Sequence, residues 1–475
     1  MSAGARGRAV RGALFAAMTA LAALVGACSR QPIGAVGTRP NVVLVTLDTV
    51  RADHCSVYGY SRPTTPGLQS LARAGTTFEA AYAPMATTSP SHATMLTGLH
   101  PRSHGVVKNG LVLGATIPTL AEVLRGAGYE TAAFVSSYVL NARFGLARGF
   151  DRFDDDFTGA NASFKSPEWE GMTVEGTFDR RADEVTSKVV AWLEARGTGA
   201  KGAASAPAAV QPLFLWVHYF DPHDPYEPPE PYRTRFAPSA PAADALARDV
   251  AAYDGEIAFT DAELARLVGA LDRVLDPRNT LLVVVGDHGE GLMDHGHMHH
   301  GLMLFEEAVR VPWLVRWSGQ VHAGARVAAP VGLVDLMPTV LALAGGTSAP
   351  RPLQGVSLAP VLTRGAPAPE HAVVMERRLY KTSPVDGFTV SGPKLAIRFG
   401  PWKYIEAPEE GSRQLFDVAR DPAERTDLAQ AEPARVQDLA ERLARWRAAT
   451  PVGEAMLPAL PSEEEQRLRA LGYTP

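Results

Sequence analysis

Three almost unbroken apolar runs constrain the fold of this chain more than any other feature. They cover residues 42–47, 213–217 and 281–286. Short runs of β-branched and aliphatic residues without polar alternation are typical of strands buried on both faces, which occur in largely parallel sheets covered by helices. We therefore predict an α/β fold with a large, mostly parallel sheet flanked by helices.

Each run is followed by side chains that can bind a metal or transfer a proton. In chain order these are Asp48, then His218, Asp221 and His223, then Asp287 and His288. In open parallel sheets the ligand site lies beyond the carboxyl ends of the strands. A single Asp at such a place is explained equally well as a helix cap, but three polar run ends together predict a functional site.

Length and charge set the organisation. A chain of 475 residues exceeds one typical domain, and short alternating segments at 394–398 and 402–405 predict a small antiparallel subdomain over residues 366–475, with terminal helices that include one at 432–448. The large domain is then residues 41–365. The net charge is −5 without a long basic block after the N-terminus, so we expect no nucleic-acid partner.

The N-terminus has the pattern of an export signal. Three arginines before residue 12 precede an apolar segment at 13–25, and small residues stand directly before Cys28. The arrangement resembles the lipobox of bacterial lipoproteins, which implies removal of residues 1–27, lipidation of Cys28 and a tether at 28–40. Ser29 resembles the signal for the outer membrane, so we expect an exported, lipid-anchored protein of the periplasm or cell envelope. A simple secretory signal with an incidental cysteine is the alternative. Cys55 is then a lone thiol, predicted to be buried.

The segment at residues 87–98 predicts a helix with a reactive hydroxyl at its start. Pro90 suits a first helical turn with Ser89 as the cap, and Gly98 suits the end. A helix N-terminus presents N–H groups to an anion, and a hydroxyl at Thr88 could bind a cation and attack a phosphorus or sulfur centre there. A purely structural cap is the alternative interpretation.

Six motifs in a fixed order resemble the sulfatase family of the alkaline phosphatase superfamily, over residues 41 to about 428. They are the strand-end Asp48, Pro90-Ser91-His92-Ala93 followed by Leu96-Thr97-Gly98, Pro222-His223-Asp224-Pro225-Tyr226, Asp287-His288-Gly289-Glu290, Phe305-Glu306-Glu307 followed by Val309-Arg310-Val311-Pro312, and Val334-Asp335-Leu336-Met337-Pro338-Thr339. The resemblance implies a metal-dependent enzyme that acts on an anionic sulfuric or phosphoric ester.

Two departures from the family pattern concern the nucleophile. Family sulfatases carry a Cys or Ser that becomes formylglycine where this chain has Thr88, and an Arg where it has His92. Threonine cannot become formylglycine, so we expect none, and the family segment with a sulfate-binding Lys and His is replaced by residues 134–139. A Thr nucleophile resembles the phosphodiesterases and phosphoethanolamine transferases of the superfamily, so Thr88 favours phosphate over sulfate esters.

The resemblance assigns roles to further residues. Asp48, Thr88, Asp287 and His288 would hold one divalent cation, for which an imidazole ligand favours Zn²⁺ or Mn²⁺ over the alternatives Ca²⁺ and Mg²⁺. A second metal that used Asp221 is an alternative that the spacing to the next histidine disfavours.

Three more side chains are candidates for substrate contacts. His223 and His300 could protonate the leaving group or bind ester oxygens, with a hydrogen-bonded structural role as the alternative. His92 could replace the missing Arg as an anion contact. Asn109 could bind a phosphoryl oxygen, although Asn before Gly110 also fits a simple turn.

The sequence thus predicts a sulfatase-family hydrolase with a covalent Thr88 intermediate, acting on a small-molecule, lipid or glycan ester. A phosphodiesterase or phosphotransferase on envelope lipids or glycans is one alternative. A non-catalytic lipoprotein that binds envelope components is the alternative from another class.

Overall fold

The computed structural model describes residues 39–157, 168–169, 172–173, 178–199, 211–238, 244–377, 380–385 and 387–458. All elements below belong to the unit of residues 36–475. The predicted signal peptide and Cys28 lie outside the described residues. No helix in the described part is long and apolar enough to cross a bilayer.

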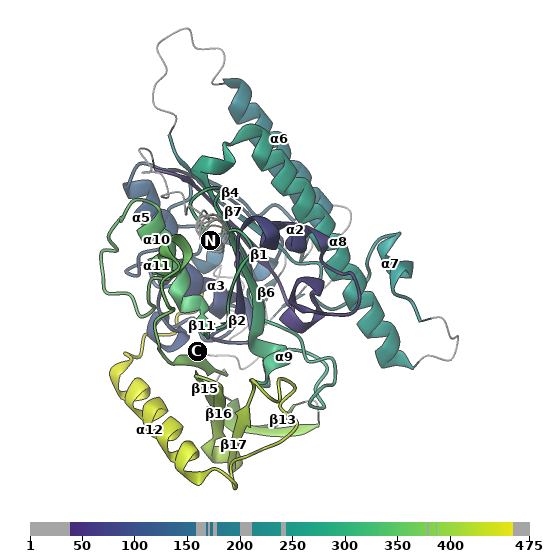
Figure 1. Ribbon diagram of the computed structural model, residues 1–475, viewed down its shortest axis with the longest axis vertical. Coiled ribbons are helices and arrows are strands. Elements are labelled where there is room, and N and C mark those ends of the chain that lie inside the picture. The colour runs from purple at the N-terminus through teal and green to yellow at the C-terminus, as the bar shows by residue number, and fades with distance from the viewer. Residues whose placement is uncertain are drawn as a thin grey trace, which may run out of the picture. The chain divides into compact units, whose positions relative to one another are not determined.

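Nine strands of the described residues form the main sheet (Figure 1). Its order is β10-β2-β9-β8-β1-β7-β3-β4, with β11 beside β2, and β9 alone runs antiparallel to its neighbours. The predicted mostly parallel sheet is therefore confirmed, and the three apolar runs are the adjacent strands β8, β1 and β7. The strands are β1 (Asn41–Leu47), β2 (Thr76–Tyr82), β3 (Glu130–Phe134), β4 (Arg152–Asp154), β7 (Leu213–Tyr219), β8 (Thr280–Gly286), β9 (Arg310–Arg316), β10 (Ala325–Val327) and β11 (Val331–Gly332).

Helices cover both faces of this sheet, as the apolar runs predict (Figure 1). In β1, Val42 and Leu44 belong to the core on one face, whereas Val43 and Val45 belong to the core on the other. The first core contains α3 (Thr88–Thr97), α5 (Leu120–Gly126), α10 (Leu336–Leu343) and α11 (Ala359–Arg364). The second contains α2 (Pro66–Ala74), α6 (Ala182–Gly199) and α8 (Ala245–Val274). Short helices α4 (Pro101–His104), α7 (Tyr232–Arg235) and α9 (Glu306–Val309) lie in connections.

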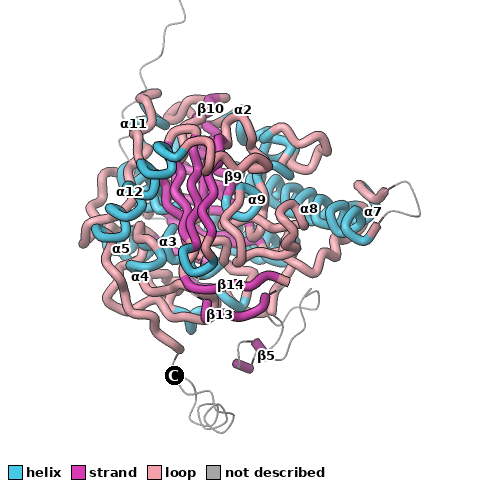
Figure 2. The backbone as a smooth tube through the Cα atoms, turned by 90° about the horizontal axis from the view of Figure 1, so that it is seen from below, coloured by secondary structure: helices cyan, strands magenta, loops and turns pink. Residues whose placement is uncertain are grey.

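A separate antiparallel sheet forms the C-terminal part, in agreement with the prediction. Its order is β12-β15-β16-β17, and α12 packs on it through Leu439 and Leu443. Two small hairpins, β5-β6 and β13-β14, lie outside both sheets (Figure 2). The bounds are β5 (Glu168–Trp169), β6 (Met172–Thr173), β12 (Val373–Glu376), β13 (Tyr380–Val385), β14 (Phe388–Gly392), β15 (Leu395–Phe399), β16 (Trp402–Ala407), β17 (Ser412–Asp417) and α12 (Pro433–Ala449). The proposed domain boundary at residue 365 stays a prediction.

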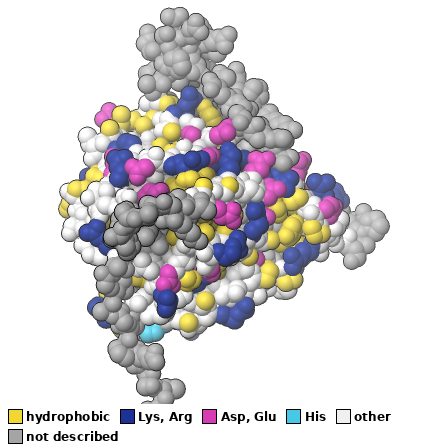
Figure 3. Space-filling view, turned by 90° about the horizontal axis from the view of Figure 1, so that it is seen from above, with side chains coloured by type: hydrophobic (Ala, Val, Ile, Leu, Met, Phe, Trp, Pro, Cys, Tyr) yellow, Lys and Arg dark blue, Asp and Glu magenta, His cyan; other side chains and the backbone are white. Residues whose placement is uncertain are grey.

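A buried ion triad connects the two sheets. Lys403 on β16 is fully buried, and its Nζ lies 3.1 Å from Glu306 Oε1 and 3.1 Å from Glu424 Oε1. Because Glu306 opens α9 directly before β9, the triad fixes the C-terminal sheet to the main sheet. At the surface seen in Figure 3, basic and acidic side chains are interspersed and do not gather by sign.

Candidate active site

The carboxyl ends of the three central strands converge at one edge of the main sheet. The Asp48 N–H donates to the Tyr219 carbonyl at 2.9 Å, and the Asp287 N–H donates to the Leu47 carbonyl at 3.1 Å. These bonds continue the ladder just past β1, β7 and β8, so the side chains that follow must point into the same space. Asp48, Asp287 and His288 are all fully buried there.

These three residues, the cation cluster, offer ligand atoms that lie within 4.8 Å of one another. Asp287 Oδ1 accepts hydrogen bonds from the Thr49 and His288 N–H groups at 3.2 and 2.7 Å. Asp48 Oδ1 and Asp287 Oδ2 have no hydrogen-bond partner among the described residues. Burial raises the pKa of both carboxyls, and the charge of Asp48 raises the pKa of Asp287 further. Two buried carboxylates with unpaired oxygens beside an imidazole fit a divalent cation.

His288 presents a lone pair to this space. Its Nδ1 lies 2.9 Å from the Gly289 carbonyl, which can only accept, so Nδ1 carries the proton. Burial lowers the pKa of His288 to about 3, which keeps the ring neutral. The free Nε2 lies 3.2 Å from Thr88 Oγ1 and is available to a cation or to the hydroxyl proton.

His92 and His218 also approach Asp287 within 4.8 Å, but their hydrogen bonds give them other roles. The Ser136 N–H donates to His218 Nδ1 at 3.3 Å, so Nε2 of the neutral ring carries the proton and donates to Asp48 Oδ2 at 3.2 Å. His92 Nδ1 donates to the Thr88 carbonyl at 2.9 Å. Neither ring turns a lone pair toward Asp287, so the protonation pattern fits a single cation.

The nucleophile candidate lies at the first residue of α3. The helix begins at Thr88 with Thr87 as N-cap, two residues before the predicted start, because Ser89 is engaged elsewhere: its hydroxyl donates to the Val139 carbonyl at 2.9 Å. Gly98 ends the helix in the left-handed conformation, as predicted. The Thr88 hydroxyl is buried, and its Oγ1 lies within hydrogen-bond distance of His288 Nε2; it also lies close enough to Asp48 to offset part of the rise that burial causes in the pKa of that carboxyl.

His223 and His300, the histidine pair, meet beside the cation cluster. His223 Nδ1 donates to the Asp224 carbonyl at 2.7 Å, and His300 Nδ1 donates to the Ala86 carbonyl at 3.1 Å. Their two Nε2 atoms lie 3.1 Å apart. Burial lowers the pKa of both rings, and a proton taken up by either ring would lie between the two nitrogens. The ring of His300 is 4.5 Å from that of His288.

Of the three other predicted site residues, Asn109 lies at the site, whereas His92 and Asp221 lie farther from it. Asn109 Oδ1 accepts from the Ser89 N–H at 2.8 Å, which fixes the amide beside Thr88 and leaves its NH₂ group to donate. His92 lies behind Thr88 rather than facing a substrate, since its Nε2 is also engaged, 3.0 Å from Thr46 Oγ1. Asp221 Oδ1 accepts from the Ala182 N–H, and burial raises the pKa of Asp221 to about 7. Asp221 belongs neither to the cation cluster nor to the set formed by His92, His218 and Asp287.

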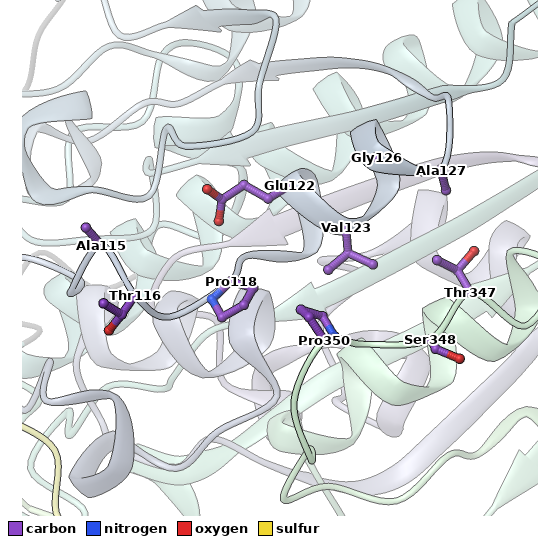
Figure 4. A pocket seen from close by; sticks show the side chains of 10 residues that line it. All are labelled: Ala115, Thr116, Pro118, Glu122, Val123, Gly126, Ala127, Thr347, Ser348 and Pro350. Carbon is purple, nitrogen blue, oxygen red and sulfur yellow. The ribbon is translucent and has the colours of Figure 1, made fainter.

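A surface pocket away from this edge carries no comparable chemistry. It lies between α5 and residues 347–350 and is lined mainly by small and apolar side chains (Figure 4). Its one carboxylate, Glu122, already accepts the Thr119 N–H in a capping box. The chemically equipped site is therefore the buried edge around Thr88.

Comparison with known proteins gives the family of this chain. The model of the sulfatase family matches residues 40–346. The chain belongs to the sulfatase family. A second family model, described as N-sulphoglucosamine sulphohydrolase, C-terminal, matches residues 293–449. The family membership expected from the six motifs is thus confirmed.

Individual relatives include both sulfatases and phosphonate hydrolases. Mouse arylsulfatase K is 33% identical over 193 residues, which cover 40% of this chain and 34% of that protein. The multifunctional alkaline phosphatase superfamily protein PehA of Trinickia caryophylli is 27% identical over 498 residues, covering 86% and 95% of the two chains. The phosphonate monoester hydrolase of Agrobacterium radiobacter has the same fold, with a TM-score of 0.67, 24% identity and coverage of 86% and 96%. The chain is a sulfatase-family hydrolase of the alkaline phosphatase superfamily.

Proposed function

We propose that this enzyme hydrolyses monoanionic esters of phosphorus through a covalent intermediate on Thr88. The observation that carries the proposal is the position of the buried Thr88 hydroxyl, whose Oγ1 lies 3.2 Å from His288 Nε2 beside the cation cluster. An attacking oxygen at a helix start, beside two unpaired buried carboxylate oxygens, is an arrangement for activating that oxygen.

Asp48, Asp287, His288 and Thr88 would hold one divalent cation, and the imidazole favours Zn²⁺ or Mn²⁺. When bound, such a cation lowers the pKa of the Thr88 hydroxyl and neutralises the two carboxylates. The chain supplies the geometry: His218 donates to Asp48, and the Thr49 and His288 N–H groups hold Asp287.

Thr88, the histidine pair and Asn109 act directly on the substrate. The Thr88 hydroxyl first gives its proton to solvent. The bond from its Oγ1 to phosphorus then forms as the bond to the leaving oxygen breaks, and the histidine pair gives that oxygen a proton taken up with the substrate. Water then attacks the phosphorus of the Thr88 ester and passes a proton back to the pair, and the bond from phosphorus to Oγ1 breaks to release Thr88 as the alkoxide. The NH₂ group of Asn109 donates to a non-bridging oxygen throughout.

Charge supports a monoanionic substrate. The hydrogen-bond partners of Thr88, His288 and the histidine pair include no lysine or arginine among the described residues. A cation of charge +2 would be balanced by the two carboxylates, so a proton taken up by the histidine pair together with the substrate would offset one substrate charge. A phosphodiester or phosphonate monoester matches that balance better than a dianionic phosphate monoester. The Agrobacterium radiobacter protein is, by its name, a phosphonate monoester hydrolase, which supports this choice.

A substrate panel tests the proposal. With Mn²⁺ or Zn²⁺ bound, we expect bis(p-nitrophenyl) phosphate and p-nitrophenyl phenylphosphonate to exceed p-nitrophenyl phosphate in kcat/KM. Thr88→Ala should abolish turnover, while Thr97→Ala, on the same helix, should retain it because the Thr97 hydroxyl only donates to the Ala93 carbonyl. Preference for p-nitrophenyl sulfate would instead establish the sulfate-ester alternative. A metal-loaded protein without any turnover would establish the non-catalytic one.

Transfer to an alcohol is the second candidate reaction, because the Thr88 ester can react with any hydroxyl that reaches it. Product analysis in the presence of glycerol separates hydrolysis from transfer. We expect water to be the main acceptor.

We also propose that the protein is exported and is anchored to the cell envelope through a lipid on Cys28. The arginines, the apolar segment at 13–25 and the small residues before Cys28 support this. Metabolic labelling with palmitate should mark the wild-type protein and not Cys28→Ser, and the variant should leave the membrane fraction. Equal labelling of both would refute the anchor.

A further inference from the structure

We infer that Tyr253, on α8, positions the cation ligands by holding the turn that follows β1. The inference rests on the proposed cation site. Tyr253 is more than 200 residues from Asp48 in sequence and belongs to none of the motifs that carry the family resemblance.

The Tyr253 hydroxyl bridges both sides of this turn. It accepts a hydrogen bond from the Arg51 N–H at 3.0 Å and donates one to the Thr49 carbonyl at 2.6 Å. The side chain is fully buried, and its ring packs edge-on against His54 and Tyr226, with centroid distances of 5.2 and 5.4 Å. The hydroxyl therefore has a fixed position and uses it to close the turn.

The turn needs such a clamp because Thr49 is held in an unfavourable conformation. Its φ of 52° is left-handed, which is costly for a β-branched residue. Asn and Asp often stabilise this conformation through their own side chains, but the Thr49 hydroxyl has no hydrogen-bond partner among the described residues. Contacts to the backbone of Thr49 must hold it instead.

The positions of both carboxylates of the cation cluster depend on Thr49. Asp48 directly precedes Thr49, so the path of the turn sets where the Asp48 side chain points. The Thr49 N–H donates to Asp287 Oδ1 at 3.2 Å. If the turn opened, Asp48 would lose its orientation and Asp287 would lose one of its two backbone donors. Tyr253 is thus a positioning residue that acts through Thr49.

The variant Tyr253→Phe removes the two hydrogen bonds and keeps the ring. Groups that orient metal ligands typically change metal affinity about 10–100-fold when removed, so we expect Mn²⁺ alone, titrated calorimetrically into the full-length protein, to bind at least about 10-fold more weakly. The readout is metal affinity without substrate, which a residue that only supports the fold would not change.

Tyr58→Phe is the matched control. The Tyr58 hydroxyl also bridges two backbone groups, since it accepts from the Trp313 N–H at 2.8 Å and donates to the Phe78 carbonyl at 3.1 Å. It does so between β2 and β9. We expect this variant to lose stability and to bind Mn²⁺ like the wild type.

Three outcomes would decide the inference. Equal Mn²⁺ affinity of Tyr253→Phe and Tyr58→Phe, with tight binding by the wild type, overturns it and leaves the proposed function intact. Absence of Mn²⁺ and Zn²⁺ binding by the wild type overturns both. Should Tyr253→Phe not fold, hydrogen exchange of the wild type decides: we expect Mn²⁺ to increase protection of residues 48–51, and no change there would overturn the inference.

Discussion

The variant Asp287→Asn should make the metal-free enzyme more stable while removing its ability to bind the cation. The amide oxygen of the substituted side chain can still accept the N–H groups of Thr49 and His288, so the fold around it is kept. What disappears is one of two buried negative charges at the carboxyl ends of β1 and β8.

The magnitude follows from the distance between the charges. The ligand oxygens of Asp48 and Asp287 lie within 4.8 Å of each other, which gives a repulsion of about 3.5 kcal/mol at an effective dielectric constant of about 20. Partial proton uptake by the buried pair reduces this in the wild type, so we expect a net gain of about 1–3 kcal/mol. For a chain of this size that corresponds to a rise in Tm of roughly 1–3 °C.

Thermal melts in EDTA and in Mn²⁺ measure both effects. In EDTA, Asp287→Asn should melt above the wild type; with Mn²⁺ at about 1,000 times its Kd, the wild type should gain about 4 kcal/mol and overtake the variant. The control is Asp335→Asn, because Asp335 is equally buried but paired with His371 at 2.9 Å; it should destabilise the protein with or without Mn²⁺. If Asp287→Asn lowers the Tm in EDTA, or keeps the Mn²⁺ shift, the reasoning about this site is wrong.

Three further predictions concern other groups. Asn109→Asp places a negative charge where the amide donates, so kcat/KM for an anionic ester should fall at least about 100-fold with little change in Tm; an unchanged kcat/KM would exclude the assigned contact. Lys403→Met leaves its two glutamate partners facing each other and should cost about 3–5 kcal/mol in chemical unfolding, against little change if the triad were exposed. Burial lowers the pKa of His371, but the hydrogen bond and charge of Asp335 outweigh it and raise the pKa above 6.5. His371→Gln should therefore lose stability relative to the wild type below about pH 6.5, with a difference that shrinks as the pH rises through the raised pKa; a pH-independent difference would refute this.

The sheet was predictable because its signal is local. The runs at β1, β7 and β8 are apolar at almost every position that two helix layers must cover, and a buried strand can be recognised without knowing its partners. Their polar ends also predicted that Asp48, Asp287 and His288 would meet. The start of α3 was predicted two residues late, because the Ser89 hydroxyl binds a carbonyl 50 positions away and the cap preference of serine is only a local tendency.

The residues that support the cation ligands could not be predicted from the sequence, because their contacts join distant parts of the chain. The role of His218 depends on a bond from the Ser136 N–H, 82 residues away, which decides which ring nitrogen keeps its proton. Tyr253 sits on α8, whose spacing predicts an ordinary amphipathic helix, and only the tertiary structure shows its hydroxyl at the turn after β1. A left-handed Thr49 has no signal in the sequence, because glycine or asparagine would be expected there.

Mass spectrometry of the enzyme quenched during turnover tests the central claim most directly. Mn²⁺-loaded protein, mixed with p-nitrophenyl phenylphosphonate and stopped in acid within a turnover, should yield a peptide that carries the phenylphosphonyl group on Thr88, and Thr88→Ala should yield none. A label on another residue, or steady turnover by Thr88→Ala, would contradict the account.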